Sequence, residues 1–284
     1  MEIINRRQRI ASIVRKLRRE QKTVGFVPTM GALHEGHFSL VRAARLRCDV
    51  VVVSVFVNPA QFGETKDFDK YPRDLTSDAA VLTELGVDLI FAPETQDIYP
   101  PGFSTYVYVE GITDALEGAS RPGHFRGVAT VVTILFNAIR PDFAFFGQKD
   151  AQQVSVIERL SRDLGFETEI VVMPIVREES GLAMSSRNER LTQEERGKAA
   201  IIYHALHSAK AAFREGTRNP AKLTEIVENT ISSEPLAKID YVAAVDPETL
   251  DPVDKIEENP VLLAVAVRFG DVRLIDNVML NKKQ

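Results

Sequence analysis

The chain has 284 residues, of which 44% are hydrophobic and 26% charged, and its formal net charge is −5. This length suffices for one large domain or two modest ones. The charge argues against nucleic acid or an anionic membrane as a partner, and no apolar run approaches the roughly 20 residues of a membrane span. The single cysteine, Cys48, excludes an internal disulfide framework and a cysteine metal cluster, and it favours a cytoplasmic location.

The first 19 residues are basic but contain no signal-peptide hydrophobic core. Ile10, Ile13, Val14 and Leu17 recur at helical spacing, which predicts an amphipathic first helix. A transit peptide is the less favoured interpretation, because the first motif of the chain begins only a few residues later.

Short apolar segments then alternate with helical patterns. Strands are expected at 24–28, 50–57, 88–91, 105–109, 143–146 and 167–173, and helices at 36–47, 75–85, 124–140 and 151–164. This alternation predicts an α/β fold: a Rossmann-like parallel sheet with right-handed crossovers, lacking the GxGxxG fingerprint. The loop at 58–74 is rich in proline, glycine and charge, which predicts a mobile surface segment.

The pattern changes at about residue 176. Helices are expected at 192–215 and 220–232, followed by strands at 239–245, 261–269 and 272–275, with Gly270-Asp271 as a hairpin turn. Helices followed by antiparallel strands predict a smaller α+β domain at 177–284, after a Rossmann-like domain at 1–176.

The segment FVPTMGALHEGHFSL, residues 26–40, changes from strand to helix character within about one turn. Gly31 and Gly36 allow the backbone to pass close to a ligand. His34 and His37 would lie on one side of the first helical turn, beside unpaired N–H groups, where phosphate binds well. Either histidine alone could equally be a cap or a surface residue. Zinc is disfavoured, because the pair lacks the i, i+4 spacing of metalloproteases.

A second segment, FFGQKDAQQ, covers residues 145–153. Lys149 could neutralise a phosphate, and Asp150 could orient ribose hydroxyls or a magnesium ion. Gln153, one turn further, could bind a polar organic substrate through its amide. Considered alone, adjacent Lys and Asp are more often a solvated helix start.

A third segment, GLAMSSRN, covers residues 181–188. Two serines, an arginine and free backbone N–H groups form a plausible anion clamp. A helix-capping loop remains the alternative. A serine hydrolase is disfavoured, because neither Ser185 nor Ser186 lies in a GxSxG elbow.

The histidine segment resembles the HxGH signature of the nucleotidyltransferase superfamily, and GLAMSSRN stands where its members carry a KMSKS-like loop. The chain as a whole resembles the pantoate:β-alanine ligase (pantothenate synthetase) family. The resemblance runs nearly end to end, through VPTMGALHEGHFSL, VFVNPAQF, YPRDL, RPGHFRGV, RPDFAFFGQKDAQQ and GLAMSSRN.

The resemblance implies roles for named residues. His37, His34 and Lys149 would be catalytic, and Asp150 would contact Mg²⁺ bound with ATP. Pantoate and β-alanine would be bound by Gln61, Gln153, Asn58, Arg121 and His124. ATP would be held by Pro28, Thr29, Met30, Gly31, Ala32, Leu33, His34, Glu35, Gly36, His37, Gly147, Gln148, Lys149, Asp150, Val176, Met184, Ser185, Ser186 and Arg187. The chain departs from the family pattern at Gln148, which is one of these positions, and at Ala60, Ala151 and Ile134, which flank the motifs.

The implied reaction is ATP-dependent condensation of pantoate with β-alanine through a pantoyl adenylate, releasing AMP and pyrophosphate. The resemblance also implies a homodimer and a small domain that closes over ATP. Two alternatives stay open: a nucleotidyltransferase that releases a nucleotidylated product, and a non-catalytic ATP-binding module.

Overall fold

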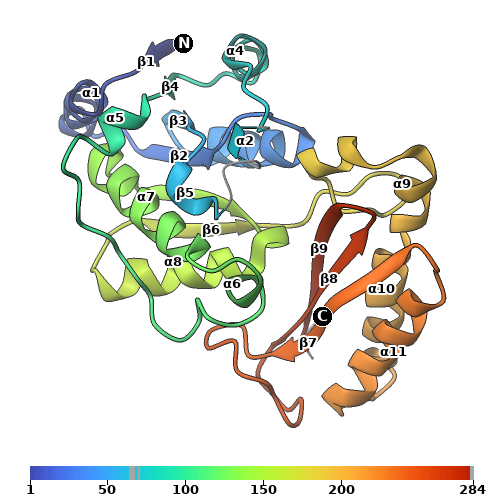
Figure 1. The fold of residues 1–284 in the computed structure, drawn as a ribbon. Helices are drawn as coiled ribbons and strands as arrows, with labels where there is room; N and C mark the ends of the chain where they lie inside the picture. Colours follow the sequence, from blue (N-terminus) through green and yellow to red (C-terminus); the bar gives the residue numbers. More distant parts are fainter. Residues whose placement is uncertain (64–67, 70, 282–284) are drawn as a thin grey trace. The chain divides into compact units, whose positions relative to one another are not determined.

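The computed structural model describes residues 1–63, 68–69 and 71–281, and it divides the chain into two compact units (Figure 1). Unit 1 comprises Met1–Gly147 and Gln153–Met173, and unit 2 comprises Gln148–Gln152 and the chain from Pro174 onward. Residues 64–67 and 70 of the loop expected at 58–74 lie outside the described residues.

Unit 1 is built on a parallel sheet of six strands, which confirms the predicted α/β class. The order is β1-β4-β3-β2-β5-β6. The chain therefore crosses from β2 to β3 on one side and later returns to pair β5 on the other. The strands are β1 (Glu2–Ile4), β2 (Val24–Thr29), β3 (Val50–Val55), β4 (Leu89–Phe91), β5 (Phe143–Gly147) and β6 (Glu169–Met173).

Helices connect these strands. They are α1 (Arg7–Arg19), α2 (Glu35–Arg47), α4 (Leu75–Glu84), α5 (Thr95–Ile98), α6 (Glu117–Ser120), α7 (His124–Ile139) and α8 (Ala151–Asp163), with a 3-10 turn η1 (Pro59–Gln61) after β3. The β3 run is buried at five successive positions, as expected for a central parallel strand covered on both faces. One face packs against Leu40, Val41 and Ala44 of α2.

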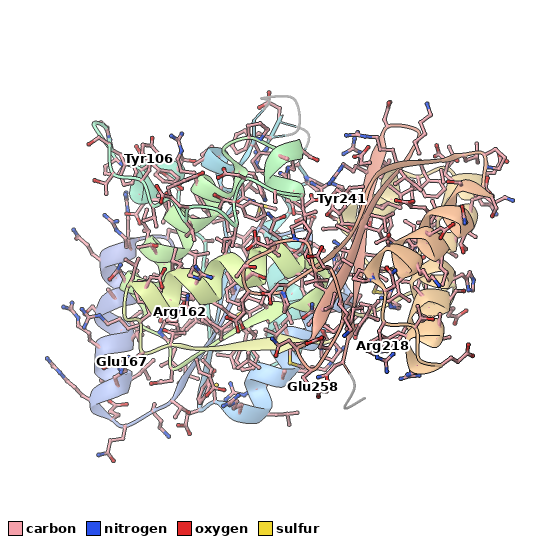
Figure 2. The ribbon with its side chains drawn as sticks, turned by 90° about the horizontal axis from the view of Figure 1, so that it is seen from below. Tyr106, Arg162, Glu167, Arg218, Tyr241 and Glu258 are labelled. Atoms are coloured by element: carbon pink, nitrogen blue, oxygen red, sulfur yellow. The ribbon has the colours of Figure 1, made fainter. Side chains whose placement is uncertain are left out.

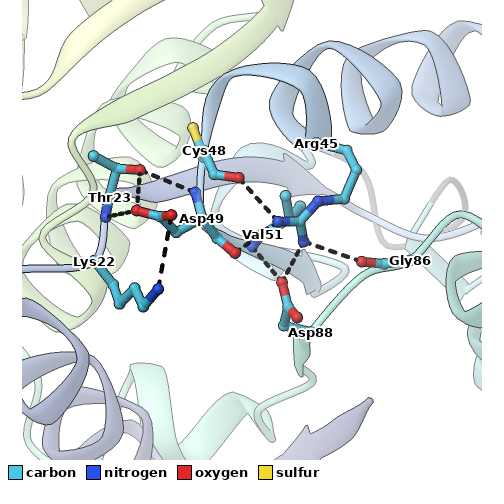
Figure 3. Close-up of polar contacts among 8 residues, drawn as sticks. All are labelled: Lys22, Thr23, Arg45, Cys48, Asp49, Val51, Gly86 and Asp88. Carbon is cyan, nitrogen blue, oxygen red and sulfur yellow. Dashed lines mark hydrogen bonds and ion pairs between the residues drawn. The ribbon is translucent and has the colours of Figure 1, made fainter. Parts of the chain in front are cut away.

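Polar contacts secure the amino-terminal edge of this sheet (Figure 3). The Arg45 guanidinium donates to the carbonyls of Cys48 and Asp49, at 2.9 and 2.6 Å, and to the Asp88 carboxylate at 2.5 Å. Asp88 in turn accepts from Val51 N at 2.8 Å. Burial raises the pKa of the Cys48 thiol to about 11, so the thiol is protonated and inert at neutral pH.

Unit 2 contains an antiparallel sheet in the order β7-β8-β9, with strands Ala237–Val245, Val261–Phe269 and Val272–Leu280. Its helices are α9 (Gln193–Ala199), α10 (Ile201–Arg214) and α11 (Pro220–Ser232), and a 3-10 turn η3 covers Ser186–Arg190. Phe269 pairs with Val272, which confirms the predicted hairpin turn at Gly270-Asp271. The core of unit 2 brings Leu263 and Val265 of β8 together with Leu206 and Phe213 of α10.

Two expectations about elements were wrong, and one strand was missed. Residues 105–109 form no strand: Val107 N donates to the Thr130 hydroxyl of α7 at 3.0 Å, so a helix side chain takes the place of a strand partner. The helix expected at 192–215 is two helices, with Ala200 ending α9 and beginning α10. The missed strand is β1, whose three residues are too few to produce a period in the sequence.

No helix in the described part of the chain is long and apolar enough to cross a membrane.

Candidate active site

The histidine loop, residues 30–37, follows the carboxyl end of β2. In this sheet β2 lies between β3 and β5, so the strand order reverses at β2, and ligands of open parallel sheets bind beside the carboxyl ends at such a switch point. Gly31 and Ala32 both have positive φ, 84° and 52°. The tight turn that they form brings the chain from the strand into α2.

The two histidines cap the amino terminus of α2 reciprocally. His34 Nδ1 accepts from Gly36 N at 3.1 Å, and His37 Nδ1 accepts from His34 N at 3.3 Å. Because both Nδ1 atoms accept hydrogen bonds, each neutral ring carries its proton on Nε2. The ring centroids are 4.2 Å apart. The cap interpretation and the phosphate interpretation are therefore compatible, since the caps use Nδ1 and the phosphate interpretation concerns Nε2–H.

Gly36 makes this arrangement possible. A Cβ on Gly36 would lie 2.9 Å from His34 Cε1 and 3.0 Å from His34 Nδ1. The glycine of the HxGH pattern thus leaves the room that the first imidazole occupies.

A buried carboxylate holds the turn before the histidines. Asp78 of α4 accepts from Leu33 N at 3.0 Å and from Ala32 N at 3.2 Å. Burial raises the pKa of Asp78, and the two backbone hydrogen bonds oppose that rise only in part. The sequence analysis did not identify Asp78, which lies 45 residues beyond Leu33 and has no motif of its own.

A second cluster in unit 1 is formed by η1 and its partners. The Gln61 side chain is buried, donates to Met30 Sδ at 3.0 Å and accepts from Asn58 Nδ2 at 3.0 Å. Asn58 also accepts from the Tyr99 hydroxyl at 2.7 Å, and burial raises the pKa of that phenol. The structure thus brings together Gln61 and Asn58, predicted for pantoate, with Met30 of the histidine loop.

The predicted residues Arg121 and His124 join the same cluster. His124 Nδ1 donates to the Gln61 carbonyl at 2.9 Å, and Arg121 Nη1 donates to His124 Nε2 at 3.2 Å. Accepting at Nε2 and donating at Nδ1 makes His124 neutral, with the tautomer opposite to that of His34 and His37. Gly127, which the sequence analysis missed, allows α7 to touch η1: a Cβ there would lie 2.3 Å from the Ala60 carbonyl oxygen.

Unit 1 also contains Gly147, at the end of β5, and the half-buried Gln153 in the first turn of α8. The remaining predicted residues belong to unit 2: Gln148, Lys149, Asp150, Val176, Met184, Ser185, Ser186 and Arg187. Each unit thus holds its own group of predicted ATP residues.

In unit 2, the Gln148–Asp150 turn is fastened to β9 by Asn277. The Asn277 amide donates to the carbonyls of Gln148 and Lys149, each at 3.0 Å, and accepts from Gln148 Nε2 at 3.1 Å. Lys149 Nζ lies 3.8 Å from the Asp150 carboxylate. Gln148, one of the departures from the family pattern, therefore has a structural partner. Asn277 was missed because it lies 128 residues beyond Lys149.

The serine loop, residues 176–188, is held by ion pairs as well as by backbone hydrogen bonds within the loop. Arg177 forms a bidentate pair with the buried Asp276 carboxylate, at 2.6 and 2.9 Å. Burial alone would raise the pKa of Glu178, but hydrogen bonds from Arg196 and Asn188 outweigh it and lower that pKa. The Asn188 Nδ2 group donates to Glu178 at 2.7 Å and to the Ala183 carbonyl at 3.1 Å.

Within this loop, Met184 N donates to the Val176 carbonyl at 3.0 Å, which joins two of the predicted ATP residues. Ser185 is the N-cap of η3, and its hydroxyl accepts from Arg187 N at 3.3 Å. The structure thus confirms that this segment contains a helix cap, and the cap orients the Ser185–Arg187 turn.

The residues present can accommodate magnesium only as part of a nucleotide complex. Within the described residues, no three His, Cys, Asp or Glu side chains are grouped to hold a metal. Asp150 supplies one half-exposed carboxylate. That donor set fits Mg²⁺ bound through one carboxylate, phosphate oxygens and water.

Comparisons with known proteins agree over nearly the whole chain. The family model described as pantoate-beta-alanine ligase matches residues 2–279. The chain is 52% identical to the pantothenate synthetase of Pelotomaculum thermopropionicum, over 99% of this chain and 100% of that protein. It is 54% identical to that of Carboxydothermus hydrogenoformans, over 95% and 96%.

Solved structures give the same assignment. The crystal structure of pantothenate synthetase from Thermus thermophilus has a TM-score of 0.92 and 46% identity, covering 99% of this chain and 100% of that one. The pantoate-beta-alanine ligase from Francisella tularensis, complexed with beta-gamma ATP and beta-alanine, has a TM-score of 0.80 and 38% identity, covering 98% and 97%. By fold, by motif and by sequence identity, the chain belongs to the pantoate-beta-alanine ligase family.

Proposed function

We propose that the chain condenses pantoate with β-alanine to form pantothenate, at the expense of ATP, through a pantoyl adenylate. A carboxylate is a poor acylating agent, because its leaving group would be oxide. In the first step, a pantoate carboxylate oxygen attacks the α-phosphorus of ATP, and the bond to pyrophosphate breaks. In the second step, the β-alanine amine attacks the acyl carbon, forms the amide and loses a proton. AMP leaves with the oxygen that joined the two groups.

The histidine loop acts on the triphosphate. With Nδ1 of His34 and His37 bound to the backbone, Nε2–H of each ring donates toward phosphate oxygens. The positive end of the α2 dipole favours an anion beside these rings. The N–H groups of Ala32, Leu33 and Gly36 shape the loop instead, because they donate to Asp78 and His34. His37 stabilises the charge that develops as pyrophosphate leaves, and no covalent enzyme intermediate is required.

The Gln61 cluster binds the organic acid. Gln61 and Asn58 hold each other in one orientation, so their amides are preorganised for a hydroxylated carboxylic acid. Gln153 supplies a further amide, and the Arg121 guanidinium supplies the donors that a carboxylate needs. His124 positions Arg121 by accepting from its Nη1.

Unit 2 contributes Lys149 and the segment Met184–Arg187 to ATP binding. Lys149 neutralises phosphate, and Ser185, Ser186 and Arg187 donate to the leaving pyrophosphate. Magnesium, when bound with ATP through Asp150, offsets the negative charge of the phosphates. Residues 177–284 act as a lid that protects the adenylate from water. Hydrogen exchange at 184–188 that is the same with and without ATP and pantoate would exclude this lid.

The proposal rests on two groups of side chains in the loops that follow β2 and β3. One is the histidine pair, whose neutral rings each carry a proton on Nε2. The other is the buried, hydrogen-bonded Gln61–Asn58 pair. The test uses pantoate labelled with ¹⁸O in its carboxylate, incubated with ATP and β-alanine. One ¹⁸O atom must appear in AMP, and pantothenate must form only when all three substrates are present. Release of ADP, or of a nucleotidylated product without β-alanine, would rule out this route. ATP binding without pyrophosphate release would favour the non-catalytic alternative.

We also propose a cytoplasmic homodimer. Tyr106 and Tyr108 are about half exposed, at 48% and 50%, on the segment at 105–109 that was expected to be a strand. An extended, aromatic segment of this kind is suited to pairing with the same segment of a second copy. Light scattering during size-exclusion chromatography checks the dimer, and Tyr106→Lys with Tyr108→Lys should shift it toward monomer. A monomeric wild-type mass would exclude it.

A further inference from the structure

A basic cavity of about 570 Å³ lies in unit 1, away from the residues assigned to ATP and pantoate. Pro141 and Thr168, in its wall, precede β5 and β6, so the cavity is at the amino-terminal edge of the sheet. The histidine loop follows the carboxyl end of β2 and is therefore at the opposite edge. The volume is in the range of small-molecule sites.

Four arginines line this basic cavity. Arg15, Arg18 and Arg19 come from α1, and Arg140 ends α7. Arg18 has a structural task, because its Nη1 donates to the Arg140 carbonyl at 2.7 Å. Among the described residues of the lining, the one acidic side chain is Glu167, labelled in Figure 2, whose carboxylate is 3.9 Å from Arg18. Arg18 also pairs with the Asp142 carboxylate at 3.8 Å, just outside the lining. The remaining arginines give the lining a net positive charge in a chain whose net charge is −5.

Arg140 occupies a position that normally favours another residue. Its φ and ψ are 46° and 58°, the left-handed conformation, at the C-cap of α7. Glycine or asparagine is usual there, because other side chains are strained. A cation at a helix C-terminus interacts well with the dipole. Gln21 and Leu250 also have positive φ, so the conformation of Arg140 is a feature of the chain's turns and leaves its side chain beside the cavity.

Aromatic rings provide the apolar part of the basic cavity. Phe136 of α7 is buried and Phe166 is half-buried, and their ring centroids are 5.5 Å apart in an edge-to-face arrangement. A guanidinium cluster recognises phosphate through paired N–H donors, and an aromatic wall recognises a planar group.

We propose that this basic cavity binds a phosphate monoester that carries an aromatic group. The phosphate contacts the guanidinium groups of Arg15, Arg19 and Arg140, and the aromatic group packs against Phe166. Glu167 opposes the anion and weakens binding. This second anion site does not depend on the proposed reaction, because none of its residues belongs to the site assigned to ATP or pantoate.

Phenyl phosphate is a suitable probe, with binding followed by calorimetry on the full chain. Wild type should bind it saturably, and Arg19→Gln with Arg140→Gly should weaken binding about tenfold or more. Glycine suits the left-handed position, so this variant should keep the wild-type melting temperature. Glu167→Gln should tighten binding, a change that a purely structural role for the arginines would not produce. Arg162→Ala is the matched control: Arg162, labelled in Figure 2, is exposed on α8, pairs with Asp163 and does not line the cavity.

Three results would overturn the proposal. These are absence of saturable binding to wild type, an equal loss in the Arg162→Ala control, and loss of binding in His34→Ala with His37→Ala, which would place the probe at the nucleotide site. If inorganic phosphate binds as tightly as phenyl phosphate, the proposed contact between an aromatic group of the ligand and Phe166 is wrong. If Arg19→Gln with Arg140→Gly does not fold, Arg15→Gln with Arg19→Gln provides the same test without changing the end of α7.

Discussion

The histidine loop and the serine loop are both assigned to the phosphates of ATP, yet they are held by different forces. Neutral caps and a buried carboxylate hold the histidine loop, through backbone N–H groups of Ala32, Leu33 and Gly36. Charged pairs anchor the serine loop to the rest of unit 2, through Arg177 with Asp276 and Glu178 with Arg196, in addition to the backbone hydrogen bonds within the loop.

The two loops should therefore respond differently to ionic strength. Backbone hydrogen bonds fix the histidine loop whatever the ionic strength, so its donors stay preorganised. Ion pairs are made by long side chains, and their strength depends on burial and on salt. Salt should therefore weaken the partly exposed Glu178–Arg196 anchor more than the buried Arg177–Asp276 anchor.

The largest effect is expected from Arg177→Met. The Asp276 side chain is only 3% exposed, so removal of Arg177 leaves a buried carboxylate without its cation. Breaking a buried pair on one side should lower the free energy of unfolding by about 3 kcal/mol. Urea denaturation of the full chain measures this loss. Arg196→Met is the control: Arg196 is 50% exposed, and its loss should be about 1 kcal/mol or less. Equal losses would remove the distinction between the two pairs.

His37→Ala should lower kcat by about 10²-fold or more, because it removes a positioned donor from the triphosphate. It should also lower the free energy of unfolding by about 1 kcal/mol, through loss of the cap. His37→Asn separates the two roles: its Oδ1 can accept the His34 N–H as Nδ1 does, so it should restore stability but not the rate. Near-normal turnover by a folded His37→Ala enzyme would contradict the catalytic assignment.

Gly36→Ala tests how closely the first histidine is packed. Alanine favours the helix by about 1 kcal/mol, so the free energy of unfolding should not fall. The new Cβ would displace the His34 ring, which it approaches to 2.9 Å, and kcat/KM for ATP should fall about tenfold. Gly197→Ala in α9 is the matched helical control, because no heavy atom lies within 4 Å of its Cβ. A similar kcat/KM in both variants would show that the His34 ring position does not matter.

The sequence predicted those features that depend on near neighbours along the chain. The bounds of β8 were correct at both ends, because an apolar run between Pro260 and Gly270 has clear limits. The histidine pair was found because motif and cap lie within four residues. The confirmed parallel sheet followed from the alternation of apolar segments.

Anchors that are distant in sequence could not be predicted. Asp78 and Asn277 hold two of the three motifs through backbone groups, and neither has a local pattern that identifies a partner. Gly127 was missed for the same reason: only glycine leaves room at this position for the Ala60 carbonyl, which is distant in sequence and close in the fold. The segment at 105–109 has strand alternation, but a strand also needs a partner, and the hydroxyl of Thr130 takes that place for Val107.

The smallest expected effect is a change in the pH dependence of the free energy of unfolding, and it has opposite signs for the two loops. The folded pKa of Glu178 is lowered, so its contribution to stability is present above its ordinary pKa near 4.5 and is lost as pH falls through the folded value. The folded pKa of Asp78 is raised, so the folded state binds that proton more tightly, and its contribution to stability increases as pH falls toward 3.8. Unfolding free energy measured between about pH 7 and 3.5 should therefore fall less steeply in Glu178→Gln than in wild type, and more steeply in Asp78→Asn. Parallel profiles in the two variants would mean that both loops respond to acid alike. The contrast between the Asp78 anchor, whose pKa is raised by burial, and the ion-paired Glu178 anchor, whose pKa is lowered, would then fail.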